Sequence, residues 1–115
     1  MKGAKARNVR IVLVTCPSLS VARKIARAVV QKRLAACVNV ARSPVESFYT
    51  WKSKLETARE HLLIIKTTGR RLRELEREVR RLHSYEVPEF VAIPITEGSA
   101  NYLSWLSEAV ARATT

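Results

Sequence analysis

The chain has 115 residues, of which 47% are apolar, and its 21 Lys and Arg against 10 Asp and Glu give a formal net charge of +11. This length allows one domain whose core needs no disulfide bridge, and it excludes two domains. With only 3 Gly and 4 Pro and no low-complexity tract, the composition excludes a largely disordered chain, so the whole chain is expected to fold.

The positive charge attracts polyanions, which makes nucleic acid one class of partner to consider. The Lys and Arg residues are spread over the amino terminus, the first predicted helix and residues 70–81. The sequence also lacks the ladder of aromatic residues on which proteins that bind single strands stack bases. A dedicated nucleic-acid role is therefore not the interpretation that the sequence favours.

Both cysteines, Cys16 and Cys37, lie in apolar runs that are typical of strands, where a reduced thiol behaves as a small apolar group. The amino terminus is basic, but the apolar run Val9–Val14 is short and no small-residue cleavage pattern follows it. No apolar stretch approaches the roughly 18 residues of a membrane span. We expect a protein of a reducing, cytoplasmic compartment, without a membrane contact.

In chain order, residues 1–8 are predicted to form a basic arm and residues 9–112 a single domain. The β-branched run Arg10–Thr15 ends at Pro17, which is typical of a buried central strand. Ser18 can cap a following helix that ends near Leu34. Its apolar stripe recurs at helical spacing, at Val21, Ala22, Ile25, Ala28 and Val29.

A second strand is predicted for Ala36–Val40, and after a loop it continues over Val45–Trp51. This strand is therefore long, and it is expected to be bent or bulged at Pro44. Lys52–Ala58 is polar and typical of a turn. Glu60–Thr68 then forms the returning strand of an antiparallel hairpin.

From Gly69 the apolar residues recur at intervals of three and four, at Leu72, Leu75, Val79 and Leu82, which predicts a second helix. The side of this helix that faces solvent is basic. Residues 82–89 form an irregular connector. Phe90–Ile95 is a fourth strand, with Pro94 where no hydrogen-bond donor is needed, and Ser99 caps a last helix.

This order, β-α-β-β-α-β with a closing helix, predicts an α+β ferredoxin-like fold, in which two right-handed β-α-β units share one antiparallel sheet. Both helices then lie on one face of the sheet. The strands are too apolar for the other face to remain in water, so a second copy of the chain is expected to cover it. The fold pattern thus predicts a homo-oligomer.

Four sequence blocks follow one another along the chain: Val14-Thr-Cys-Pro17, Lys32-Arg-Leu-Ala-Ala-Cys-Val-Asn39, Tyr49-Thr-Trp-Lys-Ser-Lys54 and His83-Ser-Tyr-Glu-Val-Pro-Glu89. In this order and spacing they resemble the CutA family of divalent-cation (copper) tolerance proteins, and together they are far more specific than one short motif. The resemblance implies a homotrimer whose long hairpin reaches neighbouring subunits, with a role in tolerance of copper and other divalent metals or in signalling. Ser53 stands where many relatives have Gly, so the hairpin turn is expected to differ from theirs.

The resemblance also implies two metal-ligating residues. His83 matches a position to which metal binding is attributed, although Leu82 replaces the histidine that some relatives carry beside it. Cys16 lies two residues after the position of a copper-binding cysteine, here Val14, and a shift of two keeps the same face of the sheet. The alternatives are that His83 interacts with the helix dipole and that Cys16 is a core residue.

The resemblance further places five residues around a cleft between subunits that could bind a ligand: Lys66, Tyr85, Glu89, Trp51 and Trp105. Convergent polar groups of this kind fix the orientation of a ligand. The alternative is that they form an ion pair and aromatic contacts that hold the trimer together. His61, beside an apolar run on the third strand, is interpreted as structural or exposed to solvent.

No nucleophile elbow, glycine-rich phosphate loop or cluster of acidic metal ligands is present, and the chain contains no Asp, so an enzyme is not predicted. The two His and two Cys match no structural zinc template, and no tightly bound cofactor is expected. The leading hypothesis is a trimer that binds copper-type metal ions weakly, or a small anionic ligand at its clefts. The alternative is a scaffold whose basic surface, Arg70–Arg81, docks acidic partners or RNA.

Overall fold

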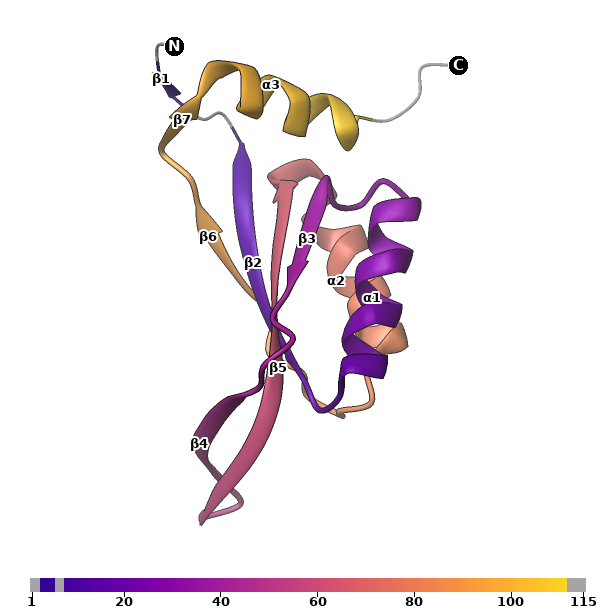
Figure 1. Cartoon of the computed structure of the whole chain (residues 1–115), viewed down its shortest axis with the longest axis vertical. Coiled ribbons are helices and arrows are strands. Elements are labelled where there is room, and N and C mark those ends of the chain that lie inside the picture. The colour runs from indigo at the N-terminus through magenta and orange to yellow at the C-terminus, as the bar shows by residue number, and fades with distance from the viewer. Residues whose placement is uncertain (1–2, 6–7, 112–115) are drawn as a thin grey trace.

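A five-stranded antiparallel sheet forms the centre of the protein, which a computed structural model describes over residues 3–5 and 8–111 (Figure 1). Its strands are β2 (Val9–Cys16), β3 (Cys37–Val40), β4 (Val45–Trp51), β5 (Lys54–Thr68) and β6 (Val91–Pro94). The helices are α1 (Leu19–Gln31), α2 (Leu72–Leu82), which follows the 3-10 turn η1 (Gly69–Arg71), and α3 (Ala100–Ala109). None of the helices in these residues is long and apolar enough to cross a lipid bilayer.

The strand order in the sheet is β3-β5-β2-β6, and β4 pairs with the outer part of β5. Each of α1 and α2 connects two strands that are separated in the sheet by one antiparallel strand, which is the arrangement of the ferredoxin-like fold. The predicted α+β fold is thereby confirmed. The helix starts also agree with prediction, because the side chain of Ser18 accepts a hydrogen bond from the Val21 amide and that of Ser99 from the Tyr102 amide.

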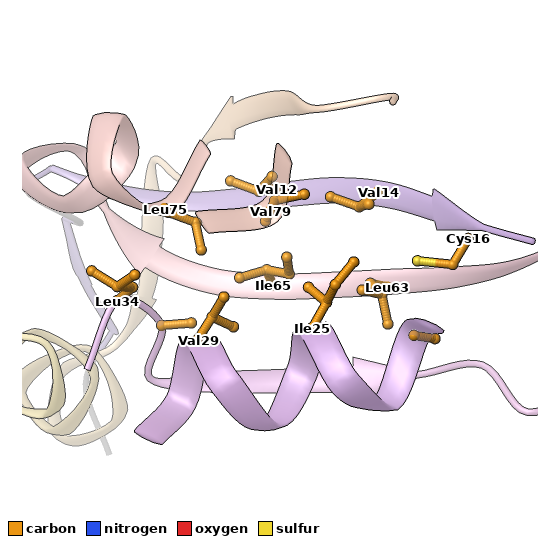
Figure 2. Packing of buried hydrophobic residues seen from close by; sticks show 12 residues of the cluster. Val12, Val14, Cys16, Ile25, Val29, Leu34, Leu63, Ile65, Leu75 and Val79 are labelled. Atoms are coloured by element: carbon orange, nitrogen blue, oxygen red, sulfur yellow. The ribbon is translucent and has the colours of Figure 1, made fainter. Parts of the chain in front are cut away.

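The core lies between one face of the sheet and the helices α1 and α2, which lie side by side (Figures 1 and 2). Alternate residues of a strand face the same side, so Val12 and Leu63 point to the helices together with their neighbours two positions away. Ile25 of α1 and Leu75 of α2 meet them, as Figure 2 shows. All of these side chains are fully buried, which accounts for the apolar stripes of both helices.

The opposite face of the sheet is apolar and only partly covered. Ile11, Leu13, Leu62 and Ile64 on this face are half-buried. On β6, at the edge of the sheet, Val91 and Ile93 are 48% and 45% exposed. Val91 pairs with Leu13 and Ile93 with Ile11, so these side chains form one continuous surface, which we call the helix-free face.

The predicted bend near Pro44 is confirmed. Val40 lies opposite Leu63 and Val45 opposite Glu60, so residues 41–44 face only residues 61–62 and the outer strand bulges between β3 and β4. The bulge separates the part of β5 inside the core from the part that projects as a hairpin with β4 (Figure 1).

The predicted turn at Lys52–Ala58 is too long. Residues 54–58 belong to β5, which pairs with β4 as far as Trp51 opposite Lys54, so the turn contains only Lys52 and Ser53. The error arose because both faces of this hairpin are exposed, and its strands lack the apolar alternation that marks a half-buried strand. Both turn residues have positive φ, 52° and 66°, as a two-residue hairpin of type I′ requires. Ser53 therefore adopts the conformation for which Gly is preferred.

A two-stranded sheet of β1 (Gly3–Lys5) and β7 (Glu97–Ser99) was not predicted from the sequence. Strands of three residues are too short to show a periodic pattern. The predicted basic arm thus includes a described segment, residues 3–5, that pairs with β7 just before α3, whereas residues 1, 2, 6 and 7 lie outside the described residues.

Helix α1 ends three residues earlier than predicted, in a C-terminal cap. The Leu34 amide donates to the Val29 carbonyl and the Arg33 amide to the Val30 carbonyl, while Arg33 has a positive φ of 59°. The Arg33 guanidinium then donates to the carbonyls of Glu108 and Ala109, at the carboxyl end of α3. A positive side chain at this end is favourable, and the contact holds α3 across the end of the sheet.

Candidate metal site and ligand cavity

A cavity of about 710 Å³ opens where the hairpin of β4 and β5 meets the connector that follows α2. Trp51, Tyr85 and Glu89, three of the five residues predicted for a ligand cleft, line it. Thr15 and Glu60 also line it, and strand alternation places both on the helix-free face. The cavity therefore opens on the side of the sheet that a second copy of the chain is expected to cover.

A partly buried hydrogen bond joins two residues of the cavity wall. The Tyr85 hydroxyl donates to Oε2 of Glu60 at 2.9 Å, and Glu60 is only 6% exposed. Burial, with the Glu60 carboxylate as a second cause, raises the pKa of Tyr85 to about 12. The hydroxyl thus keeps its proton at neutral pH and acts as a donor to Glu60, which leaves the other carboxylate oxygen, Oε1, for a ligand.

Lys66 and Trp105, the other two predicted cleft residues, lie elsewhere. Lys66 is six residues along β5 from Glu60, about 20 Å at the rise of a strand. Its Nζ is 6.0 Å from the centre of the Tyr102 ring, and that ring lies 5.5 Å from the ring of Trp105. Within one subunit the five residues therefore form two separate groups: Trp51, Tyr85 and Glu89 line the cavity, and Lys66 and Trp105 lie near Tyr102.

His83 uses both ring nitrogens in the structure. Its Nε2 donates to the Thr15 carbonyl at 2.8 Å, and its Nδ1 accepts from the Tyr85 amide at 3.0 Å. The side chain is 8% exposed, and these two bonds fix the start of the connector that lines the cavity. A metal ion could bind His83 only if it replaced one of the two bonds, because a ligand nitrogen needs a free lone pair.

Cys16 has a different histidine opposite it. It pairs with His61 in the ladder between β2 and β5, so the two side chains share one face of the sheet, with Cβ atoms about 5 Å apart. The Nδ1 of His61 lies 2.9 Å from the Ala41 carbonyl and must donate to it, because a carbonyl only accepts. The neutral ring then has its lone pair on Nε2. Sequence reasoning interpreted His61 as structural, since only the strand register reveals this pairing.

The thiol of Cys16 is protonated at neutral pH. Burial, together with the charge of Glu60, raises its pKa to about 11. Within the described residues, no group of three or more His, Cys, Asp or Glu side chains could hold a metal ion. If Cys16 bound a metal ion as a thiolate, it would lose its proton on binding.

The comparison with protein families decides what kind of protein carries this site. Residues 10–109 match the family model described as CutA1 divalent ion tolerance protein. The chain belongs to the CutA1 family.

Its relatives support this membership over most of the chain. The divalent-cation tolerance protein CutA of Thermus thermophilus is 48% identical over 98 residues, which cover 85% of this chain and 94% of that protein. The solved structure of the Thermus protein superposes with a TM-score of 0.87 at 46% identity, covering 90% of this chain and 99% of the other. That of Archaeoglobus fulgidus, described as a periplasmic divalent cation tolerance protein, gives 0.86 at 40% identity and the same two coverages.

Among the residues that the structure describes, the charged side chains that line the cavity of this CutA1-family chain are all negative. They are Glu60, Glu86 and Glu89, and no Lys, Arg or His lines it. Aromatic rings supply much of the remaining wall, from Phe48, Tyr49 and Trp51 of the hairpin and from Tyr85. Carboxylates and the faces of aromatic rings both attract cations, so this cavity suits a positively charged ligand better than an anion.

Proposed function

We propose that this CutA1-family chain is a binding protein rather than an enzyme, and that it contributes to metal tolerance by binding a copper-type ion weakly at Cys16 and His61. The pairing of these two residues across β2 and β5 is the observation that carries the proposal. A thiolate and an imidazole are ligands that suit Cu(I), which accepts two of them. The names of the relatives, divalent-cation tolerance proteins, agree with such a role.

The same proposal includes a reducing compartment and a homotrimer. Cys16 and Cys37 are both free thiols, as Cu(I) binding by Cys16 requires. A compartment of this kind is the cytoplasm, although the Archaeoglobus relative is described as periplasmic. A role in signalling would follow if the trimer changed shape with bound metal.

The protonation state of Cys16 makes the proposed affinity depend on pH. The folded thiol has a pKa of about 11, so Cu(I) must displace its proton near neutral pH. One proton released per metal ion means that the dissociation constant falls by about tenfold from pH 7 to pH 8. We expect weak binding because the metal ion must displace the proton of the Cys16 thiol.

Isothermal titration with Cu(I), Cu(II) and Zn(II) tests the site. We expect Cys16→Ala and His61→Asn to weaken Cu(I) binding by about tenfold or more. The Asn side chain keeps a donor for the Ala41 carbonyl but removes Nε2, so it tests the ligand and not the fold. Cys37→Ser and His83→Gln serve as controls and are expected to bind as the wild type does.

Two results would contradict this assignment. If the wild type binds none of the three ions, the proposed metal function is wrong. If His83→Gln loses Cu(I) binding while His61→Asn keeps it, the metal site is at His83, as the family resemblance implied.

The cavity supports a second candidate function, the binding of a small cation, because three carboxylates and four aromatic rings line it. Tetramethylammonium is a suitable cationic probe, and acetate is the corresponding anionic probe. In a Trp105→Phe variant, Trp51 is the remaining tryptophan, and we expect its fluorescence to change with tetramethylammonium but not with acetate. Glu89→Gln should weaken the response several-fold, whereas binding of acetate alone would restore the anionic ligand considered from the sequence.

A further inference from the structure

The fold gathers positive charge that is scattered along the sequence. Residues 19–33 and 69–82, which contain α1, η1 and α2, hold 11 of the 21 Lys and Arg but only 3 of the 10 acidic residues. These two segments lie side by side on one face of the sheet, in what we call the helical layer (Figure 1). The helical layer thus carries eight of the eleven net positive charges. Of its basic side chains, only Arg71 is buried.

The acidic residues of the helical layer are mostly neutralised within it. Glu78 is 7% exposed and is bridged by Lys32 at 2.7 Å and Arg81 at 2.8 Å. Glu74 pairs with Arg71, which leaves Glu76 as the exposed acid. Within the described part of the chain, the exposed side chains of Arg73, Arg77 and Arg80 form no ion pair.

These three arginines, with Arg81, line a groove of about 620 Å³ beside α2, so four arginines face two glutamates, Glu76 and Glu86, in its lining. Residues three and four apart lie on one side of a helix, with Cβ atoms about 5–6 Å apart. A planar guanidinium donates two parallel hydrogen bonds to a phosphate, so arginines at this spacing match the repeated phosphates of a nucleic-acid backbone. Nine of the eleven basic residues of the helical layer are Arg.

We propose that the helical layer binds the phosphate backbone of double-stranded nucleic acid without reading its sequence. Neither segment of the layer contains an aromatic residue, so the layer lacks the rings on which single-strand binders stack bases, which favours a duplex over a single strand. The 13 residues of α1 extend about 20 Å, along which a duplex presents roughly 12 negative charges. The layer lies opposite the helix-free face, so it stays accessible if that face is buried in an oligomer.

The sequence alone did not favour a nucleic-acid role, because its basic residues are spread over segments that lie far apart in the chain. Residues 23–33 and 70–81 are separated by three strands in the chain, and only the β-α-β crossovers place both on the same side of the sheet. The missing aromatic ladder, which argued against nucleic acid in general, argues only against single strands once the charges form one surface.

Fluorescence anisotropy with a labelled 20-base-pair duplex of random sequence tests the proposal at several salt concentrations. We expect the triple variant Arg73→Glu, Arg77→Glu, Arg80→Glu to weaken binding by about tenfold or more and to reduce the salt slope by roughly three. The matched control is Lys52→Glu, Lys54→Glu, Arg59→Glu on the exposed hairpin, which lowers the net charge by the same six units. It is expected to bind within about twofold of the wild type.

Each other outcome overturns the proposal. Equal losses in the two triple variants would mean that net charge alone causes binding, and no wild-type binding at 50 mM salt would mean that the surface has no such partner. Tighter binding of a single strand, or of polyglutamate, would assign the layer to a different polyanion. A parallel pair of variants with Gln in place of Glu, checked by circular dichroism, separates loss of charge from loss of fold.

Discussion

Replacement of Ile93 by glutamate is expected to convert the proposed homotrimer into monomers of 13.0 kDa. Ile93 is 45% exposed on the edge strand β6 and pairs with Ile11, on the apolar helix-free face. In a monomer the new carboxylate stays in water, whereas an interface over this face would have to remove its hydration without supplying a partner. Sedimentation velocity at micromolar protein concentration measures the change directly.

Val30 offers a matched control for this variant. It is 40% exposed and apolar like Ile93, but it lies on α1 in the helical layer. Val30→Glu should therefore leave the oligomer intact, since that layer is expected to face solvent in the assembly. A wild type that sediments as a 13.0 kDa monomer, or equal dissociation by both variants, would show that the helix-free face is not the interface.

The sequence predicted those features that depend on local pattern. The stripe through Ile25 and Val29 predicted which side of α1 is buried, and the serines before α1 and α3 predicted both helix starts. The order of elements then determined the sheet, because right-handed crossovers leave few topologies for two β-α-β units. Three residues of the predicted ligand cleft, Trp51, Tyr85 and Glu89, line one cavity of the subunit, and binding of a ligand there stays a prediction.

The features that were missed depend on register and on the arrangement of distant segments. Nothing in the sequence states that Cys16 lies opposite His61, because the pairing follows from the register of β2 against β5. The sequence places Lys66 and Glu60 on one predicted strand, but only the structure shows that Tyr85 bonds to Glu60, which separates Lys66 from Tyr85. The hydrogen bonds that occupy both nitrogens of His83 come from β2 and from the connector, and periodicity predicts neither.

Glu78 holds the two segments of the helical layer together, and we expect Glu78→Gln to lower the free energy of unfolding by about 2 kcal/mol at pH 7. Its carboxylate accepts hydrogen bonds from Arg81 of its own helix and from Lys32 beyond the end of α1. These bonds lower the pKa of Glu78 to about 2, with the Arg81 bond as the largest cause. The full shift would correspond to about 3 kcal/mol, but the side chains of Lys32 and Arg81 are 53% and 60% exposed, so water screens part of it.

The pH dependence of the free energy of unfolding tests whether the charge of Glu78 causes this stabilisation. Because the folded pKa of Glu78 is lower than the unfolded value of 4.5, its contribution is present above about pH 4.5 and is lost as the pH falls toward 2. Urea unfolding followed by circular dichroism, at one protein concentration because an oligomer is expected, should show the wild type and Glu78→Gln converging at pH 2. Glu76→Gln, an exposed acid on the same helix, should unfold like the wild type throughout. A gap between wild type and Glu78→Gln that persists at pH 2 would mean that the substitution disturbs packing between α1 and α2 rather than an ion pair.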